Sequence, residues 1–176
     1  MCLIPCAIDQ DPYFRLSRDI ASKLNQFKPC LIMSKFLPSL EGTNKMSSTG
    51  TTGTNSTHIN QVDKTIYVTD DPKKVAKIIK RYAFSGGGDT MEEHKKNGAN
   101  LSVDISYQYL TYFEEDDDKL EFIKEEYGSG RIGTGKVKGI LCEKIEELLL
   151  NHQENRSKIT DECIKKFMSI DKFNKD

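Results

Sequence analysis

Residues 45–49 of the chain, KMSST, place a lysine beside three hydroxyl side chains. Lys45 supplies a positive charge, and Ser47, Ser48 and Thr49 supply hydrogen-bond donors. Such groups can stabilise the charge that builds on phosphate oxygens during phosphoryl-type transfer. The following residues, up to 63, are rich in Gly, Thr, Ser and Asn, which predicts a loop. The stretch therefore fits either a mobile phosphate-binding loop or an ordinary solvated linker.

A second glycine-rich stretch, residues 128–136 (GSGRIGTGK), partly matches two phosphate-binding motifs, G-x-G-x-x-G and the Walker A loop. Both motifs require a strand before the glycines and a helix after them. Here the preceding residues have the pattern of an amphipathic helix, and Val137 stands where magnesium binding needs a hydroxyl. We therefore predict a connection between two helices.

The histidines and the acidic residues do not form the spacing of a metal site. His58, His94 and His152 are not paired at ligand spacing with another His or Cys, so solvated or structural roles are expected. Residues 114–118 (EEDDD) lack the alternate spacing and the glycine of a calcium loop. They favour a charged start of a helix, and we expect no dedicated protein metal site.

The elements that must position these residues change character along the chain. Residues 2–8 and 29–35 are short apolar, strand-like runs, and residues 12–24 between them form a helical pattern with Asp11 as its N-cap. Strand, helix and strand over this length predict a parallel crossover unit. Residues 38–63 read as a loop, and residues 64–70 as a short β-like piece.

The rest of the chain reads as helical. Glycines 86–88 are expected to cap the first helix in the left-handed conformation. The predicted fold class is α/β followed by all-α, with a boundary near residue 70. The expected helices cover residues 72–84, 91–96, 105–113, 117–127, 135–155 and 161–170. Thr90 and Thr160 are expected to cap the helices that follow them, Asp104 and Asp116 to open theirs, and Thr134 precedes the longest helix.

Composition limits the class of protein. The chain has 176 residues, a formal net charge of −1 and 36% hydrophobic residues, which argues against a uniformly basic nucleic-acid binder. Apolar runs fall short of the roughly 18 residues that span a bilayer, and the sequence opens without a secretion leader. Five scattered cysteines indicate reduced thiols and a cytoplasmic location.

Residues 5–15 (PCAIDQDPYFR) and 45–49 (KMSST) together resemble the eukaryotic-type tryptophanyl-tRNA synthetases, which are class I aminoacyl-tRNA synthetases. The resemblance continues through AFSGGGDTMEEH, DISYQYLTYFEEDDDKLE, TGKVK and HQENRSKITDECIKKFM. It covers nearly the whole chain except about residues 50–63, which look like an insertion. Tyrosine specificity is a weaker alternative.

The resemblance implies the end of a Rossmann-type catalytic domain in residues 1–69 and a helical anticodon-binding domain in residues 70–176. The His-x-Gly-His-type signature of the family's N-terminal half is not matched in this sequence. We therefore expect a C-terminal portion of the enzyme that is inactive alone. The alternative is a non-catalytic tRNA-binding or regulatory module derived from a synthetase.

The activity that the resemblance implies is the ATP-dependent activation of tryptophan to tryptophanyl-AMP and its transfer to tRNA-Trp. Mg²⁺ enters with ATP, and full-length relatives are homodimers, while the oligomeric state of this chain stays open. The implied catalytic residues are Lys45, Ser47 and Thr49; the implied ATP-binding residues are Cys6, Ala7, Lys45, Met46, Ser47 and Ser48; the implied tryptophan-binding residues are Asp9 and Gln10.

The helical part resembles the family's anticodon-reading domain. Phe84 is implied to stack on an unpaired base, Asp89 to accept from a base edge, and Lys138 to lie near the anticodon. Relatives often have arginine where this chain has Gly88. Five basic residues of the preceding helix fit either contact with backbone phosphates or a solvated face: Lys73, Lys74, Lys77, Lys80 and Arg81.

Overall fold

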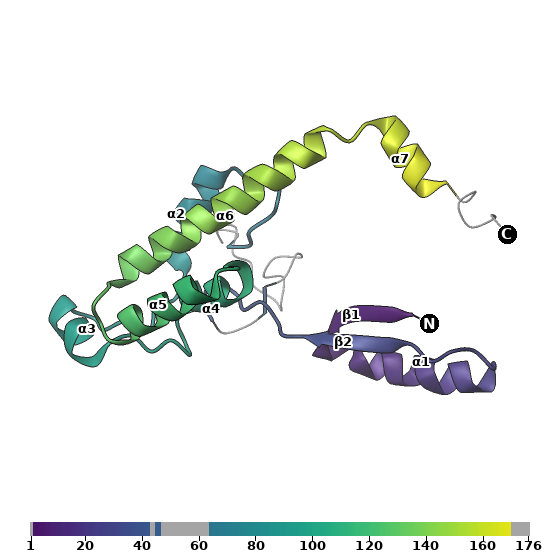
Figure 1. The fold of residues 1–176 in the computed structure, drawn as a ribbon, viewed down its shortest axis with the longest axis horizontal. Coiled ribbons are helices and arrows are strands. Elements are labelled where there is room, and N and C mark those ends of the chain that lie inside the picture. The colour runs from purple at the N-terminus through teal and green to yellow at the C-terminus, as the bar shows by residue number, and fades with distance from the viewer. Residues whose placement is uncertain (1, 43–44, 47–63, 170–176) are drawn as a thin grey trace, which may run out of the picture. The chain divides into compact units, whose positions relative to one another are not determined.

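The computed structural model describes residues 2–42, 45–46 and 64–169 (Figure 1). They fall into two compact units, one within residues 1–38 and the other within residues 39–176, and each is described here by itself. The domain boundary expected near residue 70 from the sequence stays a prediction.

The first unit is the predicted parallel crossover. Strand β1 (Leu3–Ala7) leads through a 3₁₀ helix, η1 (Ile8–Gln10), into helix α1 (Asp11–Lys23), and strand β2 (Cys30–Ser34) follows. The strands pair in parallel from Leu3 opposite Cys30 to Ala7 opposite Ser34. The predicted N-cap is wrong: Gln10 holds that position. The Asp11 carboxylate, already inside the helix, instead binds the Arg15 side chain four residues on.

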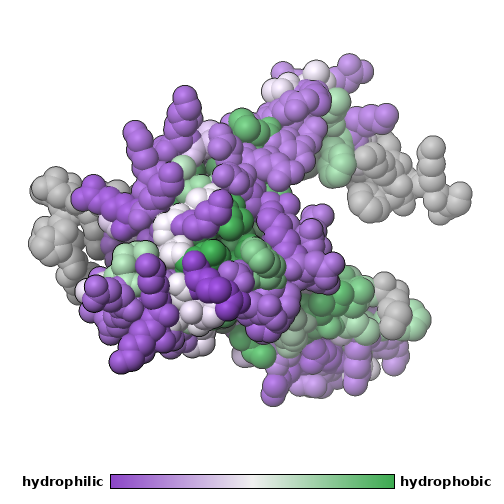
Figure 2. All heavy atoms as spheres, turned by 60° about the vertical axis from the view of Figure 1, so that its left-hand side comes forward, coloured by the Kyte–Doolittle hydropathy of each residue, from purple (hydrophilic) through white to green (hydrophobic). Residues whose placement is uncertain are grey.

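This first unit has no buried residue among residues 2–38. Large apolar side chains of this unit are exposed: Leu3, Ile8, Tyr13, Leu16, Ile20, Leu24, Phe27, Ile32 and Met33. Figure 2 shows hydrophobic groups, in green, among hydrophilic purple ones on the surface of the described residues. Parallel sheets are normally covered on both faces, and a two-stranded sheet is marginal alone in water. The unit therefore lacks a hydrophobic core of its own.

The second unit is helical and contains the buried core. Its helices are α2 (Pro72–Tyr82), α3 (Met91–Asn97), α4 (Ile105–Phe113), α5 (Asp117–Gly128), α6 (Thr134–Ser157) and α7 (Asp161–Met168). These confirm the six helices expected from the sequence. Side chains accept a hydrogen bond from a first-turn amide at five of the helix starts: Asp71, Thr90, Asp104, Asp116 and Thr160.

Helix α6 is the centre of this core, since α2, α4 and α5 all pack against it. Its buried face consists of Val137, Leu141, Cys142, Ile145 and Leu149.

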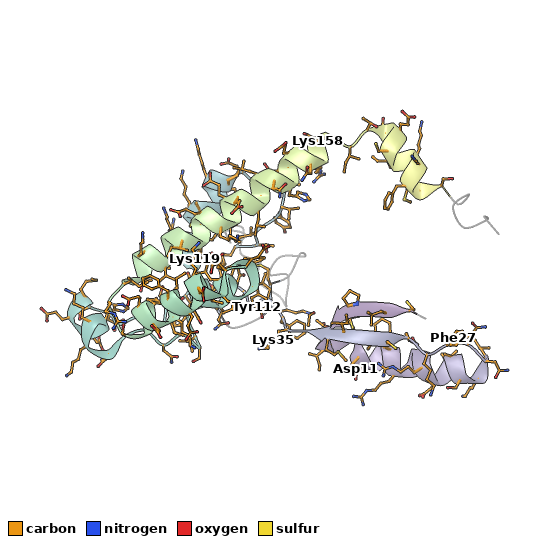
Figure 3. The ribbon with its side chains drawn as sticks, viewed as in Figure 1. Asp11, Phe27, Lys35, Tyr112, Lys119 and Lys158 are labelled. Atoms are coloured by element: carbon orange, nitrogen blue, oxygen red, sulfur yellow. The ribbon has the colours of Figure 1, made fainter. Side chains whose placement is uncertain are left out.

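An ion pair stabilises the connection between α4 and α5. The Lys119 ammonium (Figure 3) lies 2.7 Å from the carboxylate of Glu114, whose side chain is 5% exposed. The hydrogen bond from Lys119 lowers the pKa of the Glu114 carboxyl.

Two local predictions are wrong. Residues 64–70 contain no strand, because the Tyr67 carbonyl accepts from the Asp70 amide at 3.0 Å and the Asp70 carboxylate accepts from the Tyr67 amide at 3.0 Å, which closes a turn. Helix α2 ends at Tyr82, its C-cap Ala83 is extended, and Gly86–Gly88 do not adopt positive φ. The glycines after α2 therefore do not cap the helix in the left-handed conformation. Glycine is required there because these residues pack very closely against other segments of the chain.

A buried carboxylate organises the start of α4 and the end of α5. Asp104 is fully buried and accepts hydrogen bonds from the Tyr107 amide at 2.8 Å, the Gly86 amide at 2.9 Å and the Tyr127 hydroxyl at 2.7 Å. The Tyr127 hydroxyl also lies 3.0 Å from the Thr134 hydroxyl at the start of α6. One acidic side chain thus joins the loop after α2 to three helices.

We expect Tyr127→Phe to destabilise the helical unit by about 1–3 kcal/mol, because Asp104 loses one of its three donors while it stays buried. Chemical denaturation followed by circular dichroism measures the change. Tyr107→Phe is the matched control, since the Tyr107 hydroxyl makes no hydrogen bond within the described residues. Equal stability of the two variants would contradict the role given to Asp104.

We also expect amide protons of β1 and β2 to exchange with solvent much faster than those in the centre of α6. Because none of residues 2–38 is buried, local opening of the strands requires little free energy. Hydrogen exchange followed by mass spectrometry of peptides measures the difference. Comparable protection of the strands and of residues 137–149 would show that the first unit is stable by itself.

Candidate functional site

One group of candidate residues lies at the carboxyl end of β1. Cys6 and Ala7 are partly buried in the last two positions of the strand, and Asp9 and Gln10 are exposed on η1 directly after it. Ligands of open α/β sheets bind outside the carboxyl ends of parallel strands. The placement of these four residues is therefore compatible with the roles that the resemblance implies.

The lysine of the KMSST stretch belongs to the second unit. Lys45 is exposed and Met46 is partly buried. Ser47, Ser48 and Thr49 lie outside the described residues. That Lys45 lies near the carboxyl end of β1, which belongs to the other unit, stays a prediction.

The glycines after α2 permit the chain to run very close to other backbone segments. A Cβ atom on Gly86 would lie 2.0 Å from the Asn100 carbonyl oxygen, and one on Gly88 would lie 2.8 Å from the His94 amide nitrogen. Real side chains do not approach backbone atoms so closely. The arginine that the resemblance implies at residue 88 would therefore require a different path of this loop.

The candidate base-contacting residues flank these glycines and are open to solvent. Phe84 is 51% exposed, and Asp89 is exposed at the start of the turn into α3. The backbone of Phe84 is fixed on both sides: its amide donates to the Leu40 carbonyl at 2.8 Å, and its carbonyl accepts from the Ile105 amide at 3.0 Å. An aromatic ring thus extends into solvent from a rigid point of the backbone.

Lys138 lies close to the same loop, on the first turns of α6. Its ammonium group donates to the Lys80 carbonyl, 3.3 Å away, in the last turn of α2. Burial lowers the pKa of Lys138, and the negative charge of Asp104 acts in the opposite direction. Because Asp104 also holds the Gly86 amide, Lys138 and the loop of residues 84–89 share one electrostatic neighbour.

The residues that hold this loop were not predicted as a functional group. Asp104 was expected only as a helix cap, and Thr134 only as the residue before α6. His94 is buried, and its Nε2 lies 2.8 Å from the Ile132 carbonyl oxygen, which gives it a structural role. A possible signal in the sequence was the run of three glycines, which often marks a close approach of backbone segments.

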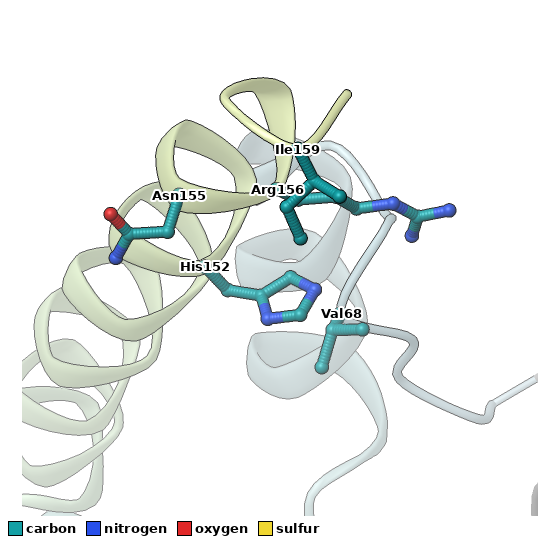
Figure 4. Close-up of a pocket in the computed structure, with 5 residues that line it drawn as sticks. All are labelled: Val68, His152, Asn155, Arg156 and Ile159. Atoms are coloured by element: carbon teal, nitrogen blue, oxygen red, sulfur yellow. The ribbon is translucent and has the colours of Figure 1, made fainter. Parts of the chain in front are cut away.

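A separate shallow pocket of about 460 Å³ lies at the far end of α6 (Figure 4). It is lined by Val68, His152, Asn155, Arg156 and Ile159, and the His152 ring points toward Val68. None of the candidate residues lines it.

Among the described residues, no group of three or more His, Cys, Asp or Glu side chains is placed to hold a metal ion. No helix in the described part of the chain is long and apolar enough to cross a membrane.

The chain is similar to known synthetases over almost its whole length. It is 50% identical over 174 residues to the cytoplasmic tryptophan–tRNA ligase of Dictyostelium discoideum and 45% identical over 176 residues to the human one. These alignments cover 98% and 99% of this chain but only 41% and 35% of those proteins. The chain therefore spans about two fifths of the length of the curated relatives that it matches.

Solved structures of synthetases are also similar to this chain over almost its whole length. The tryptophanyl-tRNA synthetase from Giardia lamblia matches with a TM-score of 0.82 and 42% identity, over 94% of this chain and 38% of that one. A product-bound parasite tRNA synthetase matches with a TM-score of 0.83 and 48% identity, over 96% of this chain and 42% of that one. The model of the family described as "tRNA synthetases class I (W and Y)" matches residues 3–150. The chain belongs to the class I tRNA synthetases of this tryptophan and tyrosine family.

Proposed function

We propose that these residues form the C-terminal portion of a cytoplasmic tryptophan–tRNA ligase. The observation that carries the proposal is the 50% identity with a protein of that name over 98% of the chain. The ligase activates tryptophan with ATP to tryptophanyl-AMP and transfers the aminoacyl group to tRNA-Trp. In this proposal the first unit and Lys45 belong to the catalytic domain, and helices α2–α7 form the anticodon-binding domain.

The proposed activation step needs positive charge on the phosphates that leave. Lys45, with the hydroxyls of Ser47 and Thr49, contacts the pyrophosphate portion of ATP, and Mg²⁺ arrives as part of the ATP complex. Met46 and Ser48, with the backbone at Cys6 and Ala7, complete the ATP site. Exposure of Lys45 suits a side chain that must reach a substrate.

Tryptophan is proposed to bind at the carboxyl end of β1. Gln10 contacts its amino group, and Asp9 lies in the same wall of the pocket. Both residues are exposed, which agrees with contact with a ligand. The exposed apolar surface of the first unit supports the view that this wall is completed by further parts of a synthetase catalytic domain.

A second candidate function is a tRNA-binding module without catalysis. The observation that favours it is the concentration of the buried core in the helical unit, which has the packing to fold without the strands. Both candidates use the loop of residues 84–89 and Lys138 for the anticodon. They differ in whether Lys45 takes part in chemistry.

We expect the 176-residue chain alone to lack tryptophan-dependent ATP–pyrophosphate exchange. A chimera with the N-terminal segment of the Dictyostelium discoideum ligase should have this activity, because it supplies the remainder of the catalytic domain. Exchange of labelled pyrophosphate into ATP measures both. Activity of the chain alone would contradict the assignment as a portion of the enzyme, and a folded but inactive chimera would favour the binding module.

In an active chimera, Lys45→Ala should lower kcat of the exchange reaction by about 10²–10³-fold, because it removes charge stabilisation in the transition state. The KM for tryptophan should change little. Lys35→Ala is the matched control, since Lys35 is also an exposed lysine but lies after β2 (Figure 3). Equal kcat values for the two variants would remove Lys45 from the proposed mechanism.

We expect Phe84→Ala to weaken binding of a tRNA-Trp anticodon stem–loop by about 1–3 kcal/mol, which is the usual contribution of one base stacked on an aromatic ring. Fluorescence anisotropy with a labelled stem–loop measures the dissociation constant. Phe122→Ala is the control, because Phe122 on α5 is 60% exposed and lies outside the proposed site. A similar loss of affinity in both variants would contradict base stacking on Phe84.

A further inference from the structure

Helix α2 differs in charge from the other helices. It carries five basic residues and no acidic residue between Pro72 and Tyr82, although the whole chain has a net charge of −1. Its apolar residues Val75, Ile78 and Ile79 are buried, so the basic residues lie on the remaining surface. A cationic surface on a protein that is acidic overall indicates a local preference for an anionic partner.

The structure divides the five basic residues into two groups. The Lys74 ammonium lies 2.8 Å from the Asp70 carboxylate, and the Arg81 guanidinium lies 5.4 Å from the centre of the Tyr82 ring. The other three lysines are exposed and have no acidic partner within the described residues: Lys73, Lys77 and Lys80. Many other basic side chains of the helical unit, such as Lys119, Lys124, Arg131 and Lys158, do form ion pairs.

The spacing of the three unpaired lysines places them in one row. Positions i, i+4 and i+7 fall within about 60° around an α-helix, opposite the buried residues. The row is about 10 Å long at 1.5 Å per residue. That length corresponds to about three nucleotides of a stacked strand at about 3.4 Å each. We call Lys73, Lys77 and Lys80 the lysine row.

The lysine row ends close in sequence to the proposed anticodon site. Helix α2 ends at Tyr82, only two residues before Phe84, so Lys80 is the member nearest to the base-contacting loop. Lys138 reaches the carbonyl of Lys80 and adds positive charge at that end. A strand whose base stacks on Phe84 would therefore bring its neighbouring phosphates toward the row.

We propose that the lysine row binds successive backbone phosphates of the tRNA beside the anticodon. This inference rests on the proposed function, because it needs tRNA as the ligand. The row positions the RNA strand and carries no sequence information, since phosphates are the same in every nucleotide. Phe84 and Asp89 then read the bases of a strand that is already held in register.

The test compares the wild-type chain with the variant Lys73→Gln/Lys77→Gln/Lys80→Gln. Glutamine removes the charge and is nearly as good a helix former as lysine, so α2 is retained, which circular dichroism checks. The control is Lys158→Gln/Lys165→Gln/Lys166→Gln. It removes three exposed charges around the C-terminal end of α6 and on α7. Binding of tRNA-Trp is measured over a range of salt concentrations.

Each phosphate contact contributes about 0.7–0.9 to the slope of log K against log salt concentration. The row variant should therefore lose about 2–3 from the magnitude of that slope and bind on the order of 100-fold more weakly at 0.1 M salt. The control should keep the wild-type slope. The row variant should weaken tRNA-Trp and a tRNA with a substituted anticodon by the same factor, because phosphate contacts do not distinguish bases.

Three results would overturn the proposal. They are a wild-type slope in the row variant, an equal loss of slope in the control, and a change in discrimination between the two tRNAs. The first would leave an acidic protein as the alternative partner of the row. A failure of the wild-type chain to bind tRNA-Trp at all would overturn the proposed function itself, and the role of the row with it.

Discussion

The carboxylate of Asp104 is fully buried, yet it accepts three hydrogen bonds, from the amides of Tyr107 and Gly86 and from the hydroxyl of Tyr127. A buried acidic group is tolerated only when such donors replace water. The same interactions begin α4, fix the end of α5 and hold the loop that follows α2. The positions of Phe84 and Asp89 depend on that loop. The residues proposed to contact RNA at the surface are therefore positioned by a polar network in the interior.

The apolar core around α6 and the polar network around Asp104 stabilise different parts of the helical unit. Apolar residues of α2, α4 and α5 pack against α6 and stabilise the helices without specifying the course of the connections. Hydrogen bonds and close backbone approaches specify the connections, as at Gly86 beside Asn100 and at His94 beside Ile132. Residues 2–38 have hydrogen bonds between their two parallel strands but no apolar core, since none of them is buried. The two units thus differ in what each needs from the rest of a synthetase.

Local features of the fold were predictable from the sequence. The strands, the six helices and the caps at Thr90, Asp104, Asp116 and Thr160 depend on short-range patterns of apolar residues and on side chains one turn away. Predictions failed where the outcome depended on distant residues. The β-like piece at residues 64–70 ends in a turn instead of forming a strand, and Gly86–Gly88 permit close packing against residues 94 and 100. A single sequence carries no direct signal for such contacts.

The choice of candidate RNA-contacting residues also depends on features that the sequence does not show. Phe84 and Phe122 are both exposed phenylalanines, so exposure alone does not separate a base-stacking ring from an ordinary surface ring. The difference is in the backbone: Phe84 is anchored by Leu40 on one side and Ile105 on the other, next to glycines that admit no side chain. A ring on a fixed backbone loses less conformational entropy when a base stacks on it. Rigidity of the backbone beneath an exposed aromatic side chain, together with unpaired positive charge on the adjoining helix, is therefore the physical basis for proposing RNA contact at this end of α2.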